Sequence, residues 1–322
     1  MEDIQPKSLI ESPTLDSLLQ QSSIQIPKRL HHYTSLESAR QILASSSLWA
    51  SSIHYMNDAQ ESFVIHTPII SWMAEFEYDF REESPERRFF QNFLRFRFAL
   101  SLPARYIISF SSEHDDLSQF RAYSKGQTGV CLTFETALLR ELSEVKNNSE
   151  QCSRKREQLQ PDLLKCIYID ETQREIVLQE MRESLEKNLN TATLVNGNEE
   201  ILAKVTSEYL EQIRPIVKNS SFRSENEWRL VYRDSPQKND IIEHLIEYRT
   251  TPNVLVPYVP ISLGFPMKPI LKEVMIGPCE NQNLNLSSVS KYIETLALKS
   301  SQSVVYGDLP RTTKSSSTFR VL

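Results

Sequence analysis

Hydrophobic and polar positions recur along the chain with two different periods, one typical of strands and the other typical of helices. Short runs rich in β-branched and aromatic residues predict strands. These runs are 29–34, 48–52, 106–111, 129–134, 164–169, 224–232, 254–259, 273–277 and 303–306. Apolar residues spaced three and four apart predict helices. These helices cover 34–45, 176–189, 201–213 and 284–298. A capping box of Thr34 and Glu37 begins the first of them.

The order of these elements predicts one α+β domain over residues 27–312, with a helical insertion at about 171–218. Residues 1–26 are polar and rich in Ser and Gln, which indicates a flexible leader with one amphipathic turn near Leu15. Residues 313–322 are rich in Ser and Thr, so we expect a frayed tail. The many aromatic residues between 61 and 102 have helical spacing, and we expect them to pack in a core.

The run 224–232 carries an unusual set of charges for a strand. A period of two places Glu225, Glu227 and Arg229 on one face and large apolar side chains, Trp228 among them, on the other. Two carboxylates on one face repel each other, and Arg229 beside Glu227 offsets that repulsion. Two interpretations stay open, namely an edge strand with a solvated polar face and a functional site.

Composition and charge narrow the classes of protein. The chain of 322 residues is 39% hydrophobic and 24% charged, and its net charge of −6 argues against a nucleic-acid binder with a dedicated basic face. The four cysteines include no CxxC, so we expect free thiols in a reducing, cytoplasmic compartment. No apolar run has the length of a membrane span, and the N-terminus lacks the pattern of a secretory signal.

Several common chemistries lack their motifs in this sequence. It contains no HExxH, no zinc spacing and no GxSxG, and its six glycines form neither a GxGxxG nor a phosphate-binding loop. We therefore expect no metal. A polar constellation remains, made of His32-Tyr33-Thr34, Asn57-Asp58 with Glu61, Ser109 and Ser111, Tyr123, and Glu225, Glu227 and Arg229. Structural roles stay open for these residues: a buried histidine bonded to backbone, a helix cap at Asn57-Asp58, and plain strand hydroxyls.

This constellation resembles a bacterial family, the domain of unknown function 2971. The resemblance rests on His32-Tyr33-Thr34, Leu48-Trp49-Ala50-Ser51, Asn57-Asp58-x-x-Glu61, Ile108-Ser109-Phe110-Ser111, Tyr123 with Gly129-Val130, Glu225-x-Glu227-Trp228-Arg229 and Ile276-Gly277-Pro278. It extends from about Leu30 to Arg311. Gln119-Phe120 stands where the family usually has a tryptophan, and we expect this position to pack.

The order of the motifs is also similar to the ADP-ribosyltransferase fold, which implies a mixed, mostly antiparallel sheet and NAD as substrate. By that resemblance His32 and Thr34, with Tyr33 between them, hold the adenosine ribose. A residue of the following strands binds the nicotinamide half of NAD, and the candidates are Trp49, Ser51, Ser109 and Ser111. Glu227 binds the hydroxyl of the nicotinamide ribose with Arg229 beside it, and Glu225 positions the acceptor.

Three hypotheses follow for the function. The first is an ADP-ribosyltransferase-like enzyme that modifies a protein or nucleic acid, as a toxin, an effector delivered to a target cell, or a phage-defence component. The second is an NAD glycohydrolase that uses water in the same pocket. The third is a binding or scaffold module that uses the face of Glu225 and Glu227. The first two need a carboxylate near an oxocarbenium-like transition state. None of the three involves a membrane.

Overall fold

A computed structural model of the chain describes residues 8–22, 25–55, 64–98, 105–124, 126–143, 161–190, 198–233, 245–251, 253–265, 270–299 and 309–317. The chain forms two compact units. The helical unit comprises Met1–Ile24, Met56–Pro103 and Lys165–Ser224, and the sheet unit comprises Gln25–Tyr55, Ala104–Leu164 and Glu225–Leu322. Whether both fold as one domain over residues 27–312, with an insertion at 171–218, stays a prediction.

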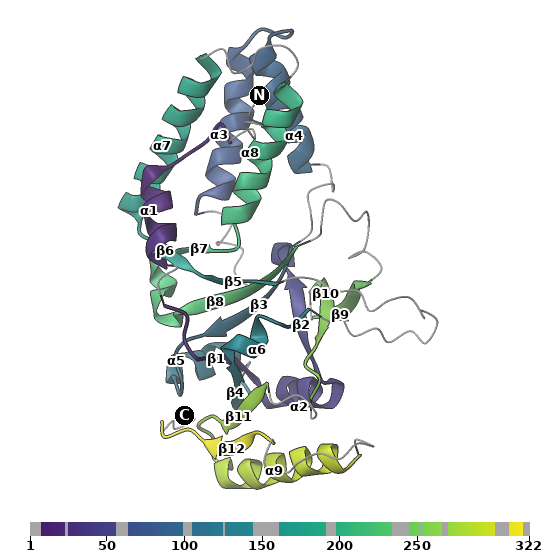
Figure 1. The fold of residues 1–322 in the computed structure, drawn as a ribbon. Coiled ribbons are helices and arrows are strands. Elements are labelled where there is room, and N and C mark those ends of the chain that lie inside the picture. Colours follow the sequence, from purple (N-terminus) through teal and green to yellow (C-terminus); the bar gives the residue numbers. More distant parts are fainter. Residues whose placement is uncertain are drawn as a thin grey trace. The chain divides into compact units, whose positions relative to one another are not determined.

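The sheet unit is built on strands that are mostly antiparallel to one another (Figure 1). They are β1 (Arg29–Ser35), β2 (Ser47–Ser52), β3 (Arg105–Ser111), β4 (Gly129–Glu135), β5 (Pro161–Lys165), β8 (Glu227–Arg233), β9 (Glu247–Thr250), β10 (Leu255–Ser262), β11 (Leu271–Ile276) and β12 (Arg311–Lys314). The strand order is β12-β11-β4-β1-β3-β2-β10-β9, and β8 pairs with β3 and β5. Among the described registers of this sheet, only β11 and β12 pair in parallel. The expected α+β class with a mixed, mostly antiparallel sheet is thus confirmed.

Helices lie on both faces of this sheet. On one face, α2 (Leu36–Ser45) and α9 (Gln282–Lys299) pack their apolar side chains on a core of strand residues such as Leu30, Leu230 and Val274. On the other, α5 (Leu117–Tyr123) packs Phe120 against Tyr33, Cys131 and Met275. The short helices η1 (Ile53–Tyr55) and α6 (Thr136–Leu139) complete the described elements of this unit.

The sheet divides at β3, and this division positions the candidate site. One edge of β3 pairs with β8 along its whole length. The opposite edge is shared, because β1 pairs with it at Ser111 and β2 pairs with it at Tyr106 and Ile107. Between these points β1 and β2 diverge beside residues 108–110. Backbone groups of β3 in that gap need other partners, since buried polar backbone groups are almost always hydrogen-bonded.

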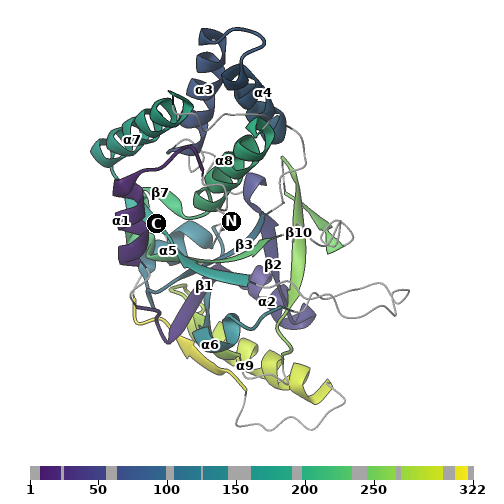
Figure 2. The same cartoon turned by 45° about the horizontal axis from the view of Figure 1, so that its top comes forward.

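The helical unit holds the expected amphipathic helices and the aromatic stretch. Its elements are α1 (Pro13–Ser22), α3 (His66–Phe76), η3 (Glu77–Asp79), α4 (Pro85–Phe98), β6 (Ile167–Ile169), α7 (Glu171–Asn190), α8 (Glu199–Ile213), β7 (Val217–Asn219) and η5 (Ser220–Glu225). Helices α4 and α8 pack along each other (Figure 2). Phe89, Phe90 and Phe93 of α4 are fully buried, which confirms that these aromatic residues serve a core.

Four local expectations differ from the structure. The cap of α2 is Ser35 rather than Thr34, because pairing with β4 keeps Thr34 extended and the Ser35 side chain accepts from the Ser38 amide. The run 164–169 breaks at Cys166 into β5 and β6. Leu9 and Ile10 of the expected leader are buried, and Glu180 accepts hydrogen bonds from the residues that begin α1. The tail expected from residue 313 begins inside β12.

Some expectations fall outside the described residues. Asn57, Asp58 and Glu61 lie there, and so does the expected strand 303–306. Within the described part, no helix combines the length and the apolar character that crossing a membrane requires.

Candidate functional site

A small pocket lies at the division of the sheet, wholly within the sheet unit. It has a volume of about 60 Å³, and its walls come from β1, β3, α5 and the segment that leads into β8. The lining residues are His31, His32, Tyr33, Ser109, Phe110, Ser111, Gln119, Tyr123, Glu225 and Glu227. These four elements, separated by up to almost 200 residues, therefore meet here, as expected for β1 and the Glu225 stretch. Titratable side chains from β1, α5 and the Glu225 stretch line the same space.

Glu227 and Arg229 form an ion pair on the face of β8 opposite the apolar core. Arg229 donates from Nε to Oε1 of Glu227 at 2.7 Å and from Nη2 to Oε2 at 3.0 Å. Glu227 is 4% exposed and Arg229 is 0% exposed. The interpretation as an edge strand with a solvated polar face is wrong, because β8 has a neighbour on each side. A bidentate guanidinium fixes the carboxylate in position and favours its charged form.

Glu225 lines the pocket, but it does so from the end of η5 and not, as the alternating pattern predicts, from a strand. It ends η5, and Asn226 has a φ of 43°, so the chain turns before β8 begins at Glu227. Glu225 is therefore not a strand residue, and the predicted start of this strand at residue 224 is wrong. The Ser111 hydroxyl donates to the Glu225 carbonyl oxygen at 2.7 Å and fixes this turn. The hydroxyl of Tyr123 donates to the Glu225 carboxylate at 3.2 Å.

His32 fills part of the gap between β1 and β2. Its Nδ1 lies 2.9 Å from the carbonyl oxygen of Ser109. A carbonyl only accepts, so Nδ1 carries the proton and donates. Burial lowers the pKa of His32, although this hydrogen bond opposes the shift. The ring is accordingly neutral near pH 7, and its Nε2 offers a lone pair. The expected contact between a buried histidine and the backbone is confirmed, and it leaves Nε2 as an acceptor.

Ser109 and Ser111 differ although both are hydroxyls on the same face of β3. Ser111 accepts from the Glu113 amide and donates to Glu225, so its role is to hold the turn. The Ser109 hydroxyl oxygen is buried and has no hydrogen-bond partner among the described residues. A buried hydroxyl without a partner costs free energy unless a ligand or water satisfies it.

His31 is a pocket residue that the sequence argument missed. Its Nδ1 lies 3.0 Å from the Thr133 hydroxyl, and its ring centroid lies 4.8 Å from that of His114, which in turn contacts Glu273 at 3.1 Å. Burial and the neighbouring His114 lower the pKa of His31 to about 4, although Glu273 opposes this. His31 alternates with His32 along β1, so the pair points to the two sides of the strand. Two adjacent histidines in a strand could have signalled this arrangement.

The helix α5 contributes two lining residues, Tyr123, which belongs to the polar constellation of the sequence, and Gln119, which the sequence argument missed. Gln119 is 4% exposed and lies one turn before Tyr123, so both face the pocket. No sequence pattern marked Gln119, because its burial depends on elements that are distant in the sequence. Phe120, between them, points to the other side of α5. It packs as expected for the position that departs from the family pattern.

Four expected site residues lie elsewhere or serve the scaffold. Trp49 stacks on Tyr258 at 4.5 Å, and Ser51 accepts from Arg249 at 3.1 Å, so both belong to a separate cluster on β2, β9 and β10. Thr34 does not line the pocket. Tyr33 lines it, but its hydroxyl donates to the Glu113 carbonyl at 2.7 Å and accepts from the Asp116 amide at 3.0 Å. Burial raises the pKa of Tyr33.

The fold and the pocket define a class of protein, an α+β protein whose divided sheet holds two carboxylates beside a neutral histidine. Residues 119–230 match the sequence model of a family described as a protein of unknown function (DUF2971), which confirms the family resemblance over this stretch. Neither the curated proteins nor the solved structures contain a match to the chain. In the described part of the chain, no three His, Cys, Asp or Glu side chains group to hold a metal.

Proposed function

We propose that this pocket cleaves the bond between nicotinamide and ribose in NAD and passes ADP-ribose to a macromolecular acceptor. One observation carries the proposal: His32, Ser109, Glu225 and Glu227 line one pocket although they come from three distant segments. The choice of NAD as the substrate rests on the similarity of the motif order to that of ADP-ribosyltransferases. A toxin, an effector or a phage-defence component, acting in the cytoplasm, is the biological setting that we propose for it.

Glu227 is the residue that we assign to the transition state. Loss of nicotinamide leaves positive charge on the ribose carbon and ring oxygen, as in glycoside hydrolysis. A fixed carboxylate that accepts a hydrogen bond from the ribose hydroxyl beside that carbon stabilises the transition state more than the ground state. Arg229 donates to both Glu227 oxygens and so holds the carboxylate in the orientation from which we propose that it acts on the substrate.

His32 and Ser109 are the residues that we assign to substrate binding. The neutral His32 ring can accept a ribose hydroxyl through Nε2 while Nδ1 remains bonded to Ser109. The Ser109 hydroxyl, which has no partner among the described residues, can bond the carboxamide of nicotinamide. Glu225, held by Tyr123, would position the acceptor. Trp49 and Ser51 receive no role, because they do not line this pocket.

The size of the pocket sets a condition on this function. Sites for small molecules usually measure about 300–1,000 Å³, whereas this pocket measures about 60 Å³. NAD therefore requires the pocket to widen as it binds. The described segment most suited to move is α5, because it is only seven residues long and carries two of the lining side chains.

A binding experiment with two histidine variants tests the proposal. NAD should raise the melting temperature of the wild-type protein, because a ligand of the native state stabilises it by mass action. His32→Asn keeps a donor in the place of Nδ1 for the Ser109 carbonyl and removes the Nε2 acceptor. It should abolish the rise while changing the ligand-free melting temperature little. His54→Asn, at an exposed histidine, should behave as wild type.

Turnover measurements distinguish the remaining functions. Nicotinamide release that needs a cell lysate indicates transfer to an acceptor, whereas equal release without lysate indicates an NAD glycohydrolase. The third function is a non-catalytic binding or scaffold module that uses the face of Glu225 and Glu227. That function becomes the better account if millimolar NAD neither shifts the melting temperature nor is consumed.

A further inference from the structure

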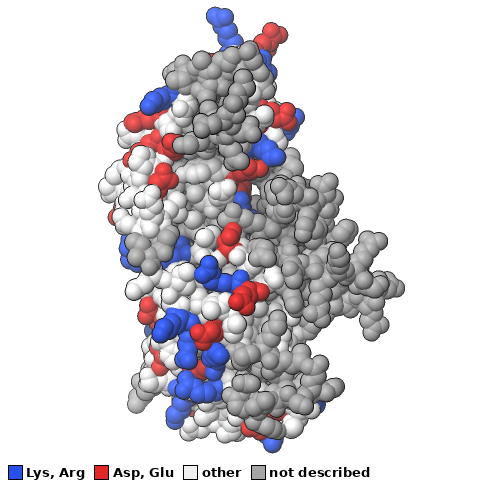
Figure 3. Space-filling view, viewed as in Figure 1, with Lys and Arg blue, Asp and Glu red and all other residues white. Residues whose placement is uncertain are grey.

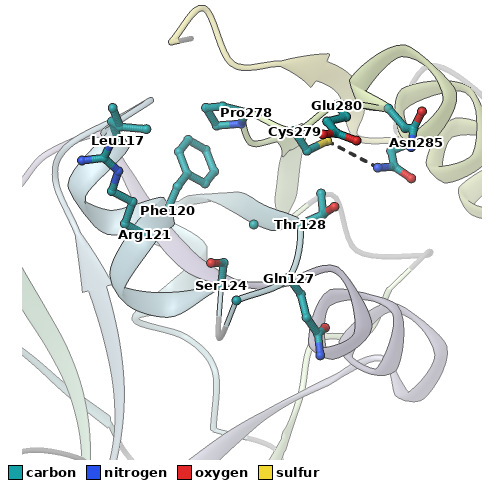
Figure 4. Close-up of a pocket in the computed structure, with 13 residues that line it drawn as sticks. Leu117, Phe120, Arg121, Ser124, Gln127, Thr128, Pro278, Cys279, Glu280 and Asn285 are labelled. Carbon is teal, nitrogen blue, oxygen red and sulfur yellow. Dashed lines mark hydrogen bonds between the residues drawn. The ribbon is translucent and has the colours of Figure 1, made fainter. Parts of the chain in front are cut away.

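A second and larger pocket lies on the opposite side of α5, again wholly within the sheet unit. Its volume is about 570 Å³, within the usual range for small-molecule sites. Three segments form it: α5, the loop before β4, and the segment from Pro278 to the first turn of α9. Figure 4 shows the Phe120 ring on one side of the space and Cys279 and Asn285 on the other. NAD cleavage as proposed above makes no use of this pocket.

Two glycine-containing motifs of the sequence meet at the base of this pocket. The Gly277 amide donates to the Gly129 carbonyl at 2.8 Å, which joins the end of β11 to the start of β4. A Cβ atom on Gly277 would lie 2.6 Å from the Phe120 ring, and one on Gly129 would lie 2.9 Å from it. Both positions therefore need glycine so that the edge of the Phe120 ring can approach the backbone this closely. Phe120, Leu117 and Pro278 provide the apolar part of the lining.

The polar part of the lining favours an uncharged ligand. Arg121 and Glu280 contribute one charge of each sign. Glu280 lies two residues before α9, where a carboxylate already complements the positive end of the helix dipole and repels an anion. The Thr128 hydroxyl and the Asn285 carboxamide lie opposite the Phe120 ring in Figure 4. An asparagine carboxamide presents a donor and an acceptor side by side, which matches the N6 and N7 edge of adenine.

We infer that this pocket is a binding site for an uncharged planar heterocycle of the purine type. The ring lies against Leu117 and Pro278, above the buried Phe120, and Asn285 and Thr128 bond its edge. The ligand contacts the Phe120 side of α5, whereas Tyr123, on the same helix, contacts Glu225 in the small pocket. The inference does not rest on NAD cleavage, so either can hold without the other.

Cys279 provides a reporter inside the pocket. It is a free, half-buried thiol, and Asn285 Nδ2 donates to its sulfur at 3.5 Å. The other described cysteines, Cys131 and Cys166, are buried, and burial raises the pKa of the Cys131 thiol to about 12. Alkylation by N-ethylmaleimide, followed by peptide mass spectrometry, measures the rate at Cys279 separately from every other cysteine. The assay involves neither NAD nor catalysis.

Adenosine is the probe, and inorganic phosphate is the comparison. Adenosine should slow alkylation of Cys279 by the factor 1 + [L]/Kd, about tenfold at about nine times Kd. Phosphate should leave the rate unchanged. No protection by adenosine up to its solubility limit would overturn the inference, and so would protection by phosphate alone, because that would indicate an anion site at α9.

A matched pair of variants locates the ligand. The double variant Thr128→Val/Asn285→Leu preserves side-chain size and removes the hydrogen-bonding groups. It should lose the protection, measured as the ratio of its own rates with and without adenosine. Asn283→Leu lies on the same turn of α9 but outside the pocket, and it should retain full protection. Equal protection in the double variant and the wild type would contradict the site.

Discussion

At the scale of single residues, burial decides what a change at Glu227 does. The pair of Glu227 and Arg229 is almost fully buried, whereas the pair of Glu37 and Arg40 on α2 is about half exposed. Removing one partner of a buried pair costs about 3–5 kcal/mol, because the other charge remains in a poorly solvated place. An exposed pair contributes about 1 kcal/mol or less.

Urea unfolding of two isosteric variants checks this difference. Glu227→Gln should lower the free energy of unfolding by several times the loss caused by Glu37→Gln, the matched exposed variant. Equal losses would mean that Glu227 and Arg229 stabilise the fold no more than a surface pair does. If the pair lay exposed on an edge strand, Glu227→Gln would lower the free energy of unfolding only slightly.

The second residue-scale prediction concerns pH and His31. In the unfolded chain His31 gains a proton near its ordinary value of about 6.5, but in the folded chain its pKa is about 4. Between these values the unfolded state binds more protons, so stability falls as the pH is lowered through this window. His31 alone should lower the free energy of unfolding by about 3 kcal/mol once the pH has fallen below about 4, and it should have no such effect above pH 6.5.

His31→Asn isolates this contribution, because the amide can still bond Thr133 but does not titrate. The free energy of unfolding of the variant should depend less on pH than that of the wild type between about pH 4 and 7. Parallel pH profiles for wild type and His31→Asn would show that His31 does not titrate differently on folding.

At the scale of elements, the close contact of α5 with the ends of β4 and β11 requires glycine at positions 129 and 277. A Cβ atom on Gly129 would lie 2.9 Å from the Phe120 ring. Gly129→Ala should therefore cost about 1–3 kcal/mol, as overpacking usually does. In a Phe120→Ala background the same change should cost clearly less, since the clashing Cδ1 atom is gone. Urea unfolding of the four proteins of this cycle gives the comparison, and an undiminished cost would place the strain in the backbone.

Elements were predictable where local pattern decides them. The alternation in Trp228, Leu230 and Tyr232 correctly identified the core face of β8, and β-branched runs located β1, β3 and β4. The start of β8 was missed because Asn226 turns the chain by a left-handed conformation, which no hydrophobic pattern encodes. His31 and Gln119 were missed because their burial depends on strands and a helix far away in sequence.

At the scale of the whole molecule, charge bears on the acceptor. The net charge is −6, and acidic and basic side chains intermingle on the described surface in Figure 3. Non-specific binding to nucleic acid draws mainly on phosphate contacts with Lys and Arg. A protein acceptor is therefore the first to test, by labelling a cell lysate with NAD that carries a tagged adenine.

Glu225→Gln tests the assignment of the acceptor side. The change keeps a group that can accept from Tyr123 and removes the charge. Labelling of the acceptor should fall more than release of nicotinamide into water, because the proposed role of Glu225 is to position the acceptor rather than to stabilise the ribose. A parallel fall of both activities would assign Glu225 to the cleavage step instead.

Nicotinamide release by the wild type and by Glu227→Gln tests the central claim most directly. Both proteins are compared at a temperature where circular dichroism shows them fully folded, so the expected loss of stability does not enter. The wild type should release nicotinamide from NAD, and Glu227→Gln should do so about a hundredfold more slowly or worse, as when a group that stabilises transition-state charge is removed. Release at the wild-type rate by the folded variant, or no release by the wild type with or without lysate, would contradict the account.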